Sequence, residues 1–116
     1  MIVPIVLTQA ANDAIDLAAV TSRAKARALA MRGKLVQTWL FPRDFGGPPD
    51  RANELFVPPE AARRIEALIA RLLTQRGDTP PRTMTVRPAY RGDSIVPTSI
   101  TYTIHPDTDR VTIPVW

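Results

Sequence analysis

The hydrophobic pattern of the chain changes period once, near residue 80, and this change limits the fold more strongly than any other property of the sequence. Apolar residues recur at helical spacing between Pro59 and about Arg76, and Pro59 occupies the first helical position, where a missing N–H is tolerated. Gly77 and the prolines at 80 and 81 end this helix. Three alternating segments follow, at residues 82–90, 96–104 and 110–115. They predict a meander of three antiparallel strands.

The first half of the chain predicts a second helix and further strands. Residues 9–32 read as one helix that closes at Gly33, and the apolar residues at 2–7 and 34–41 read as strands. We therefore expect one domain, residues 1–116, with an α+β fold. In this fold two main helices pack on an antiparallel sheet with the three-stranded meander at its C-terminal end.

Composition excludes several kinds of active site. The 116 residues contain no cysteine and one histidine, His105, which lies in a predicted turn and is expected to be solvated. Zinc-thiolate sites, thiol nucleophiles and multi-histidine metal cages are thereby excluded. No apolar run approaches the length of roughly 20 residues that spans a bilayer, so no membrane partner is expected. The cysteine-free chain fits the cytoplasm, or delivery by a bacterial secretion system.

Basic residues predict a partner with negative charge. The formal net charge is +4, and a run without acidic residues extends from Arg23 to Lys34. The candidate nucleic-acid-binding residues are Arg23, Lys25, Arg27, Arg32, Lys34, Arg43 and Arg51. Contacts from these residues to phosphates would weaken steeply with salt. The simpler reading is that the run is the solvated C-terminal end of a helix, where cations complement the helix dipole.

Residues 42–58 are rich in proline and glycine and predict a long loop. Long ordered loops in a compact domain are often functional. Gly46 and Gly47 permit backbone conformations that other residues rarely adopt, while Asn53 and Glu54 stand just before an apolar step into the helix. The structural alternative is a loop held in place by the packing of Phe45, Leu55 and Phe56.

Two segments in fixed order carry a resemblance to a known family. The motif positions are Phe45, Gly46, Gly47, Asn53, Leu55, Val57 and Pro58 in the loop, and Pro88, Tyr90, Gly92, Asp93 and Pro97 in the hairpin after the helix. Residues 35–104 thus resemble the DNA/RNA non-specific endonuclease-type domains at the C-termini of bacterial polymorphic toxins. These domains belong to the His-Me finger, or ββα-metal, nucleases. The resemblance implies a His-Me-finger-like β-loop-α unit in the centre of the fold.

The chain departs from this family at the catalytic position. Counting back from Phe45, the family's general-base histidine falls on Trp39. An indole has no basic nitrogen and cannot accept a proton from water. The family's metal-binding asparagine matches Asn53, and Glu54 adds a carboxylate beside it, so these two residues are the candidate metal ligands. We assign no catalytic residue and expect no cofactor, with Mg²⁺ implied only if the chain is an active nuclease.

Three functions follow as hypotheses. The first is a catalytically silent nuclease-like domain that binds nucleic acid or a protein partner in a bacterial toxin or secretion context. The second is an active metal-dependent DNA/RNA endonuclease toxin with a rearranged site, because a metal-bound water can react without a protein base. The third is an immunity or adaptor protein that binds a toxin. The sequence leaves the oligomeric state open, and the first hypothesis is the one that its residues favour.

Overall fold

The computed structural model describes residues 16–76, 83–105 and 109–116, and it has an α+β fold with two antiparallel sheets. The helices are α2 (Arg23–Met31) and α3 (Pro59–Arg76), with the 3₁₀ helices η1 (Leu17–Ala19), η2 (Arg43–Phe45) and η3 (Arg51–Asn53). The strands are β1 (Val36–Trp39), β2 (Glu54–Val57), β3 (Thr83–Ala89), β4 (Ser99–His105) and β5 (Asp109–Pro114). The strand expected at residues 2–7 and the beginning of the helix expected at 9–32 lie outside the described residues.

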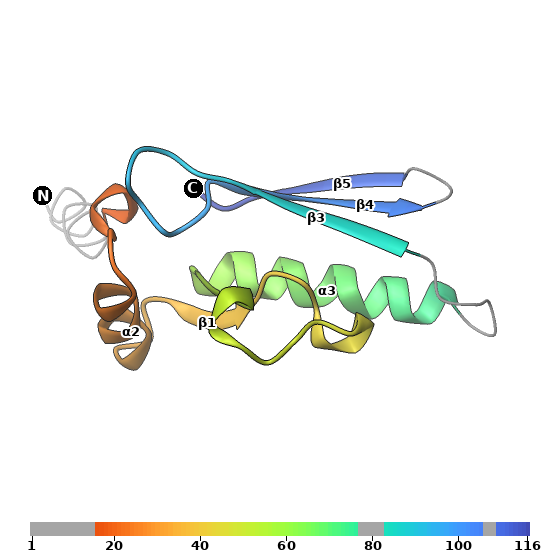
Figure 1. The fold of residues 1–116 in the computed structure, drawn as a ribbon, viewed down its shortest axis with the longest axis horizontal. Coiled ribbons are helices and arrows are strands. Elements are labelled where there is room, and N and C mark those ends of the chain that lie inside the picture. The colour runs from red at the N-terminus through yellow and green to blue at the C-terminus, as the bar shows by residue number, and fades with distance from the viewer. Residues whose placement is uncertain (1–15, 77–82, 106–108) are drawn as a thin grey trace, which may run out of the picture.

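The elements form two layers. The sheet β3-β4-β5 makes one layer, and α3 runs along its inner face together with the short ribbon of β1 and β2 (Figure 1). The buried side chains of α3 include Ala61, Ala62, Ile65 and Leu68, which meet the inward side of β4 in one core. The predicted helix at 59–76 and the three-stranded meander are both confirmed. In the parts of the chain that are described, no helix has the length and apolar content to cross a membrane.

The predicted helix at residues 9–32 is wrong as one continuous element. Its described part is interrupted after η1, and α2 begins only after Ser22, whose hydroxyl accepts a hydrogen bond from the Lys25 amide. Val20 lies in the interruption, where its carbonyl accepts a hydrogen bond from the Ile95 amide at 2.9 Å. That long-range bond requires a carbonyl that points away from the helix axis, so the helix cannot run through residue 20.

The segment predicted as a loop, residues 42–58, contains a strand. β2 occupies its last residues and pairs antiparallel with β1, so that Val36 faces Val57 and Trp39 faces Glu54. β2 carries three buried apolar residues in succession, because both faces of the ribbon are covered. Leu55 and Val57 enter the core beneath the sheet, and Phe56 enters a second core beside α2. A strand buried on both faces lacks the alternation by which strands are recognised in sequence.

One further expectation concerns His105. The histidine is not in the turn but is the last residue of β4, with its Nε2 atom 3.3 Å from the hydroxyl of Thr85 on β3. β4 alternates regularly between buried and half-buried residues, and His105 falls on the outer side with Thr101 and Thr103. β4 ends at His105, which pairs with Thr83, so the strand extends one residue beyond the end predicted at residue 104.

Candidate functional site

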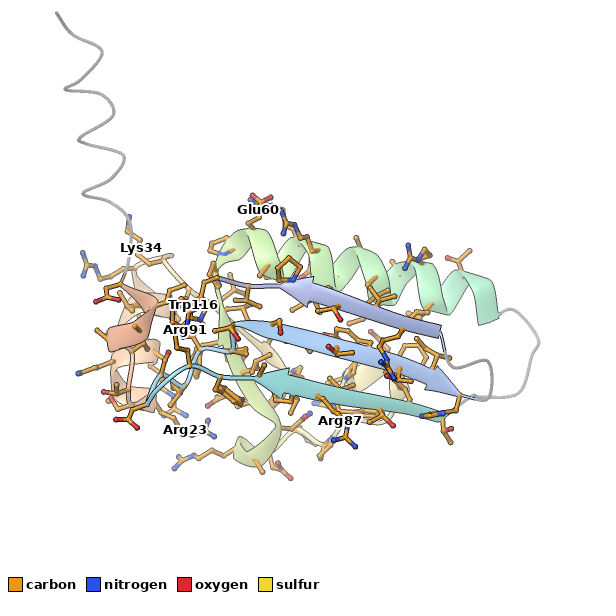
Figure 2. The ribbon with its side chains drawn as sticks, turned by 90° about the horizontal axis from the view of Figure 1, so that it is seen from above. Arg23, Lys34, Glu60, Arg87, Arg91 and Trp116 are labelled. Carbon is orange, nitrogen blue, oxygen red and sulfur yellow. The ribbon has the colours of Figure 1, made fainter. Side chains whose placement is uncertain are left out.

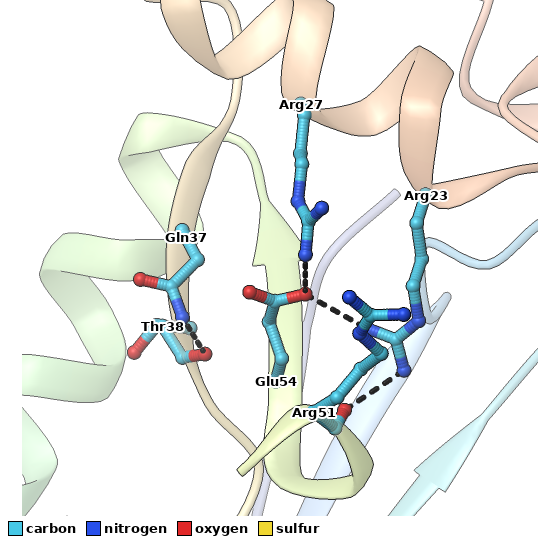
Figure 3. Close-up of polar contacts among 6 residues, drawn as sticks. All are labelled: Arg23, Arg27, Gln37, Thr38, Arg51 and Glu54. Atoms are coloured by element: carbon cyan, nitrogen blue, oxygen red, sulfur yellow. Dashed lines mark hydrogen bonds and ion pairs between the residues drawn. The ribbon is translucent and has the colours of Figure 1, made fainter. Parts of the chain in front are cut away.

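The side chain of Glu54 is the centre of a cluster of arginines. Its Oε1 atom accepts hydrogen bonds from Arg23 at 2.7 Å and from Arg27 at 3.2 Å, both of which extend from α2 (Figure 3). Arg23 also donates to the backbone carbonyl of Arg51 at 2.9 Å, and Figure 3 shows Arg51 next to these contacts. The Glu54 side chain is only 15% exposed, against 38% for Arg23 and 49% for Arg27. We call Arg23, Arg27, Arg51 and Glu54 the Glu54 cluster.

Trp39 adjoins this cluster through the strand pairing. It is the β1 residue opposite Glu54, and side chains of directly paired residues lie on the same face of a ribbon. The guanidinium of Arg43 lies over the indole, 5.8 Å from the ring centroid. Trp39 is half-buried as a residue. The position where the resemblance places a general base thus holds an aromatic ring with an arginine stacked on it.

Asn53 holds the loop between β1 and β2 together. Its side-chain oxygen accepts a hydrogen bond from the Phe41 amide at 2.7 Å, and its nitrogen donates to the carbonyls of Phe41 at 2.9 Å and Pro48 at 3.0 Å. The residue is 6% exposed. The candidate metal ligands are therefore adjacent in sequence but have different partners, since Glu54 faces the arginines. In the described residues, no group of three or more acidic or histidine side chains is placed to hold a metal ion.

The Phe45-Gly46-Gly47 motif has a steric explanation. Gly46 has a φ of 94° and ends η2 in the left-handed region, which glycine adopts without cost. A Cβ atom on Gly47 would stand 1.9 Å from the Phe41 carbonyl oxygen, the same oxygen that accepts from Asn53. The motif residues and Asn53 thus form one closely packed turn, which fixes the direction in which β2 leaves the loop and presents Glu54.

A pocket of about 390 Å³ opens beside the Glu54 cluster. It brings together segments that are distant in the sequence: the start of α2, the end of β1, β2, and the loop at residues 90–95. Its lining residues are Arg23, Leu40, Ala52, Glu54, Leu55, Phe56, Tyr90, Gly92, Asp93, Ser94 and Ile95. The hairpin motif residues Tyr90, Gly92 and Asp93 therefore line the same pocket as Leu55, one residue of the loop motif.

The loop at residues 90–95 is tied to the start of the described chain. The Ser94 hydroxyl donates to the Leu17 carbonyl at 2.6 Å and accepts a hydrogen bond from the Val96 amide. These bonds hold Tyr90 and Asp93 over the pocket opposite Arg23. Burial raises the pKa of the Tyr90 hydroxyl above its ordinary value, while the positive charge of Arg23 acts in the opposite direction. Sequence reasoning could have placed this loop only by knowing that the hairpin folds back onto η1.

The predicted basic run divides between two faces of α2. Arg23 and Arg27 flank buried Ala26 and face Glu54, whereas Lys25 is exposed and donates to the hydroxyl of Thr21. Arg32 follows the last residue of α2 and is exposed as well. Figure 2 shows Lys34 and Arg23 on opposite sides of this end of the molecule. Of the seven predicted nucleic-acid-binding residues, the fold therefore brings together Arg23, Arg27 and Arg51, with Arg43 nearby on Trp39.

No family model matches the sequence, and no curated protein or solved structure matches the chain either. The resemblance to His-Me finger nucleases accordingly stays a prediction. The β1-loop-β2-α3 order and the geometry of the Glu54 cluster are the observations from which a function is argued.

Proposed function

We propose that this chain binds nucleic acid through the Glu54 cluster and Trp39 without cleaving it. The observation that carries the proposal is the convergence of Arg23 and Arg27 on the one carboxylate of Glu54, with Arg51 beside them through its backbone carbonyl. Arg23 lines the pocket with Glu54 and Asp93, Arg27 pairs with the same Glu54 carboxylate, and Arg43 lies over Trp39 on the strand opposite, so this end of the molecule offers several guanidinium groups. Guanidinium groups bind phosphate oxygens through paired hydrogen bonds, and half-exposed arginines keep donors available for them.

Trp39 supports single-stranded nucleic acid as the ligand. A base can stack on an indole, which contributes about 1–3 kcal/mol per base. On this half-buried ring the base would displace the Arg43 guanidinium or use the opposite face. The same ring argues against hydrolysis by a protein general base, because it stands where the resemblance places the proton acceptor. The engagement of the Asn53 side-chain oxygen by the Phe41 amide also argues against a metal ion on that oxygen. The resemblance to toxin nucleases favours a bacterial toxin or secretion setting for such binding.

The binding test is fluorescence anisotropy with single-stranded DNA and RNA octamers between 50 and 200 mM salt, the range over which phosphate contacts lose affinity steeply. We expect each neutralised phosphate to contribute a slope of about −0.7 to log K against log salt concentration. Arg51→Ala removes an exposed guanidinium whose own backbone carbonyl holds Arg23, so the fold contacts persist. This variant should reduce the slope by about 0.7.

The matched control is Lys25→Ala, which removes one positive charge from the opposite face of α2. It should leave affinity and slope within error of the unchanged protein. Equal losses in both variants would show that net charge, and not the Glu54 cluster, determines binding. Digestion of plasmid and RNA with Mg²⁺ or Mn²⁺ tests the second half of the proposal. Intact substrate is expected, and cleavage that EDTA stops would overturn it.

A further inference from the structure

The pocket beside the Glu54 cluster combines apolar walls with two acidic side chains. Leu40, Leu55, Phe56 and Ile95 supply the apolar part of its lining. Both ion pairs of Glu54 use Oε1, and among the described residues no hydrogen bond reaches its Oε2 atom. Asp93 adds a second, exposed carboxylate, and Tyr90 adds a hydroxyl on an aromatic ring. The volume of about 390 Å³ falls within the range of small-molecule sites.

The charges around the pocket restrict its ligand. A cationic side chain would satisfy the free carboxylate oxygen but would be repelled by Arg23, Arg27 and Arg51. A simple anion would suit the arginines but would leave Glu54 Oε2 and Asp93 without donors. The ligand that fits both has uncharged N–H donors next to a negative charge. A nucleotide has this combination, because the amino and imino groups of its base lie beside a phosphate.

We propose that the pocket receives one unpaired base, with a preference for guanine, while the arginines hold the adjacent phosphate. This inference rests on the nucleic-acid binding proposed above. Guanine presents two adjacent donors on its Watson–Crick edge, which match carboxylate oxygens, whereas thymine presents one N–H between two acceptors that Glu54 and Asp93 would repel. The ring of Tyr90 and the apolar walls provide contact for the flat base.

The experiment compares thymidine octamers that differ only at one central base. Guanine, hypoxanthine and thymine are placed there, and hypoxanthine differs from guanine only by the missing exocyclic amino group. We expect the guanine octamer to bind about fivefold or more tightly than the thymine octamer, with hypoxanthine between them. Fluorescence anisotropy at fixed salt gives the three affinities. Equal affinities of the unchanged protein for all three octamers would overturn the base pocket.

Variants of three pocket residues test which side chains produce the guanine preference. Asp93→Asn and Tyr90→Ala alter exposed side chains, and Glu54→Gln replaces the free oxygen, so each should reduce the guanine preference to about twofold or less. Glu60→Gln is the control, since Glu60 also pairs with two arginines but lies on α3 away from Arg23 (Figure 2). A preference that survives all three pocket variants contradicts the inference. Salt-dependent binding without preference leaves the proposed function standing, and no binding of any octamer removes both.

Discussion

The side-chain amide of Asn53 pairs with the backbone of Phe41 in both directions, accepting from its N–H at 2.7 Å and donating to its carbonyl at 2.9 Å. This mimics one rung of a β-ladder between residues that are 12 positions apart. Because Asn53 immediately precedes β2, the pairing also sets where Glu54 stands relative to α2. The residue that the resemblance selects as a metal ligand therefore positions the Glu54 cluster.

Asn53→Ala should lower the free energy of unfolding by about 2–3 kcal/mol, because three part-buried hydrogen bonds to the backbone of Phe41 and Pro48 are lost. Urea denaturation followed by circular dichroism measures this. The loss should be the same with Mg²⁺ and with EDTA. A loss that appears only when Mg²⁺ is present would instead identify Asn53 as a metal ligand.

Gly47→Ala should destabilise the loop by about 2 kcal/mol or more, since the new Cβ would meet the Phe41 carbonyl oxygen at 1.9 Å and force the turn apart. Gly46→Asn is the comparison. Nothing lies within 4 Å of a Cβ at Gly46, and asparagine tolerates its left-handed backbone. The melting temperature of the Asn variant should lie close to that of the unchanged protein. The reverse order would contradict the packing described for this motif.

Tyr102→Phe should be neutral or stabilising at pH 7. The Tyr102 hydroxyl is buried beneath the sheet without a hydrogen-bond partner in the described structure, so its removal relieves an uncompensated desolvation. Burial also raises the pKa of Tyr102 to about 12.

The raised pKa of Tyr102 makes the free energy of unfolding depend on pH, and the direction of the change can be worked out. The unfolded state ionises first, near pH 10, so the free energy of unfolding is unaffected below pH 10 and falls as pH rises toward 12. The unchanged protein should lose up to about 3 kcal/mol more than Tyr102→Phe over this interval. Urea titrations at pH 9 and pH 11 measure the difference, and parallel losses in the two proteins would show that Tyr102 is not responsible.

Glu54→Gln should have opposite effects on stability and binding. Two arginines lose their ionic partner, which should lower the free energy of unfolding by about 1–2 kcal/mol. The guanidiniums are then available to phosphate, so affinity for the thymidine octamer should rise at 50 mM salt, an increase that screening reduces at higher salt. Glu60→Gln is the matched control, expected to change stability by well under about 1 kcal/mol because its pairs are exposed. Unchanged octamer affinity in Glu54→Gln would argue against phosphate contacts by Arg23 and Arg27.

Elements with a regular local pattern of apolar residues could be predicted from the sequence. α3 matched its predicted bounds because Pro59 and the regular apolar stripe are local signals, and β4 alternated as expected because one of its faces is buried and the other is not. The α+β class followed from these two patterns. The sequence was also sufficient to show that residue 39 cannot act as a general base, because an indole has no basic nitrogen.

The other features depend on contacts between distant parts of the chain. β2 was not predicted because both of its faces are covered, which removes the alternating pattern. The helix interruption at Val20 depends on a hydrogen bond from Ile95, 75 positions along the chain. Glu54 meets Arg23 across 31 positions, and the pocket forms only where the loop at 90–95 folds back toward η1. Contacts of this kind form when complete elements pack against one another. The local pattern of residues does not show which distant elements will meet.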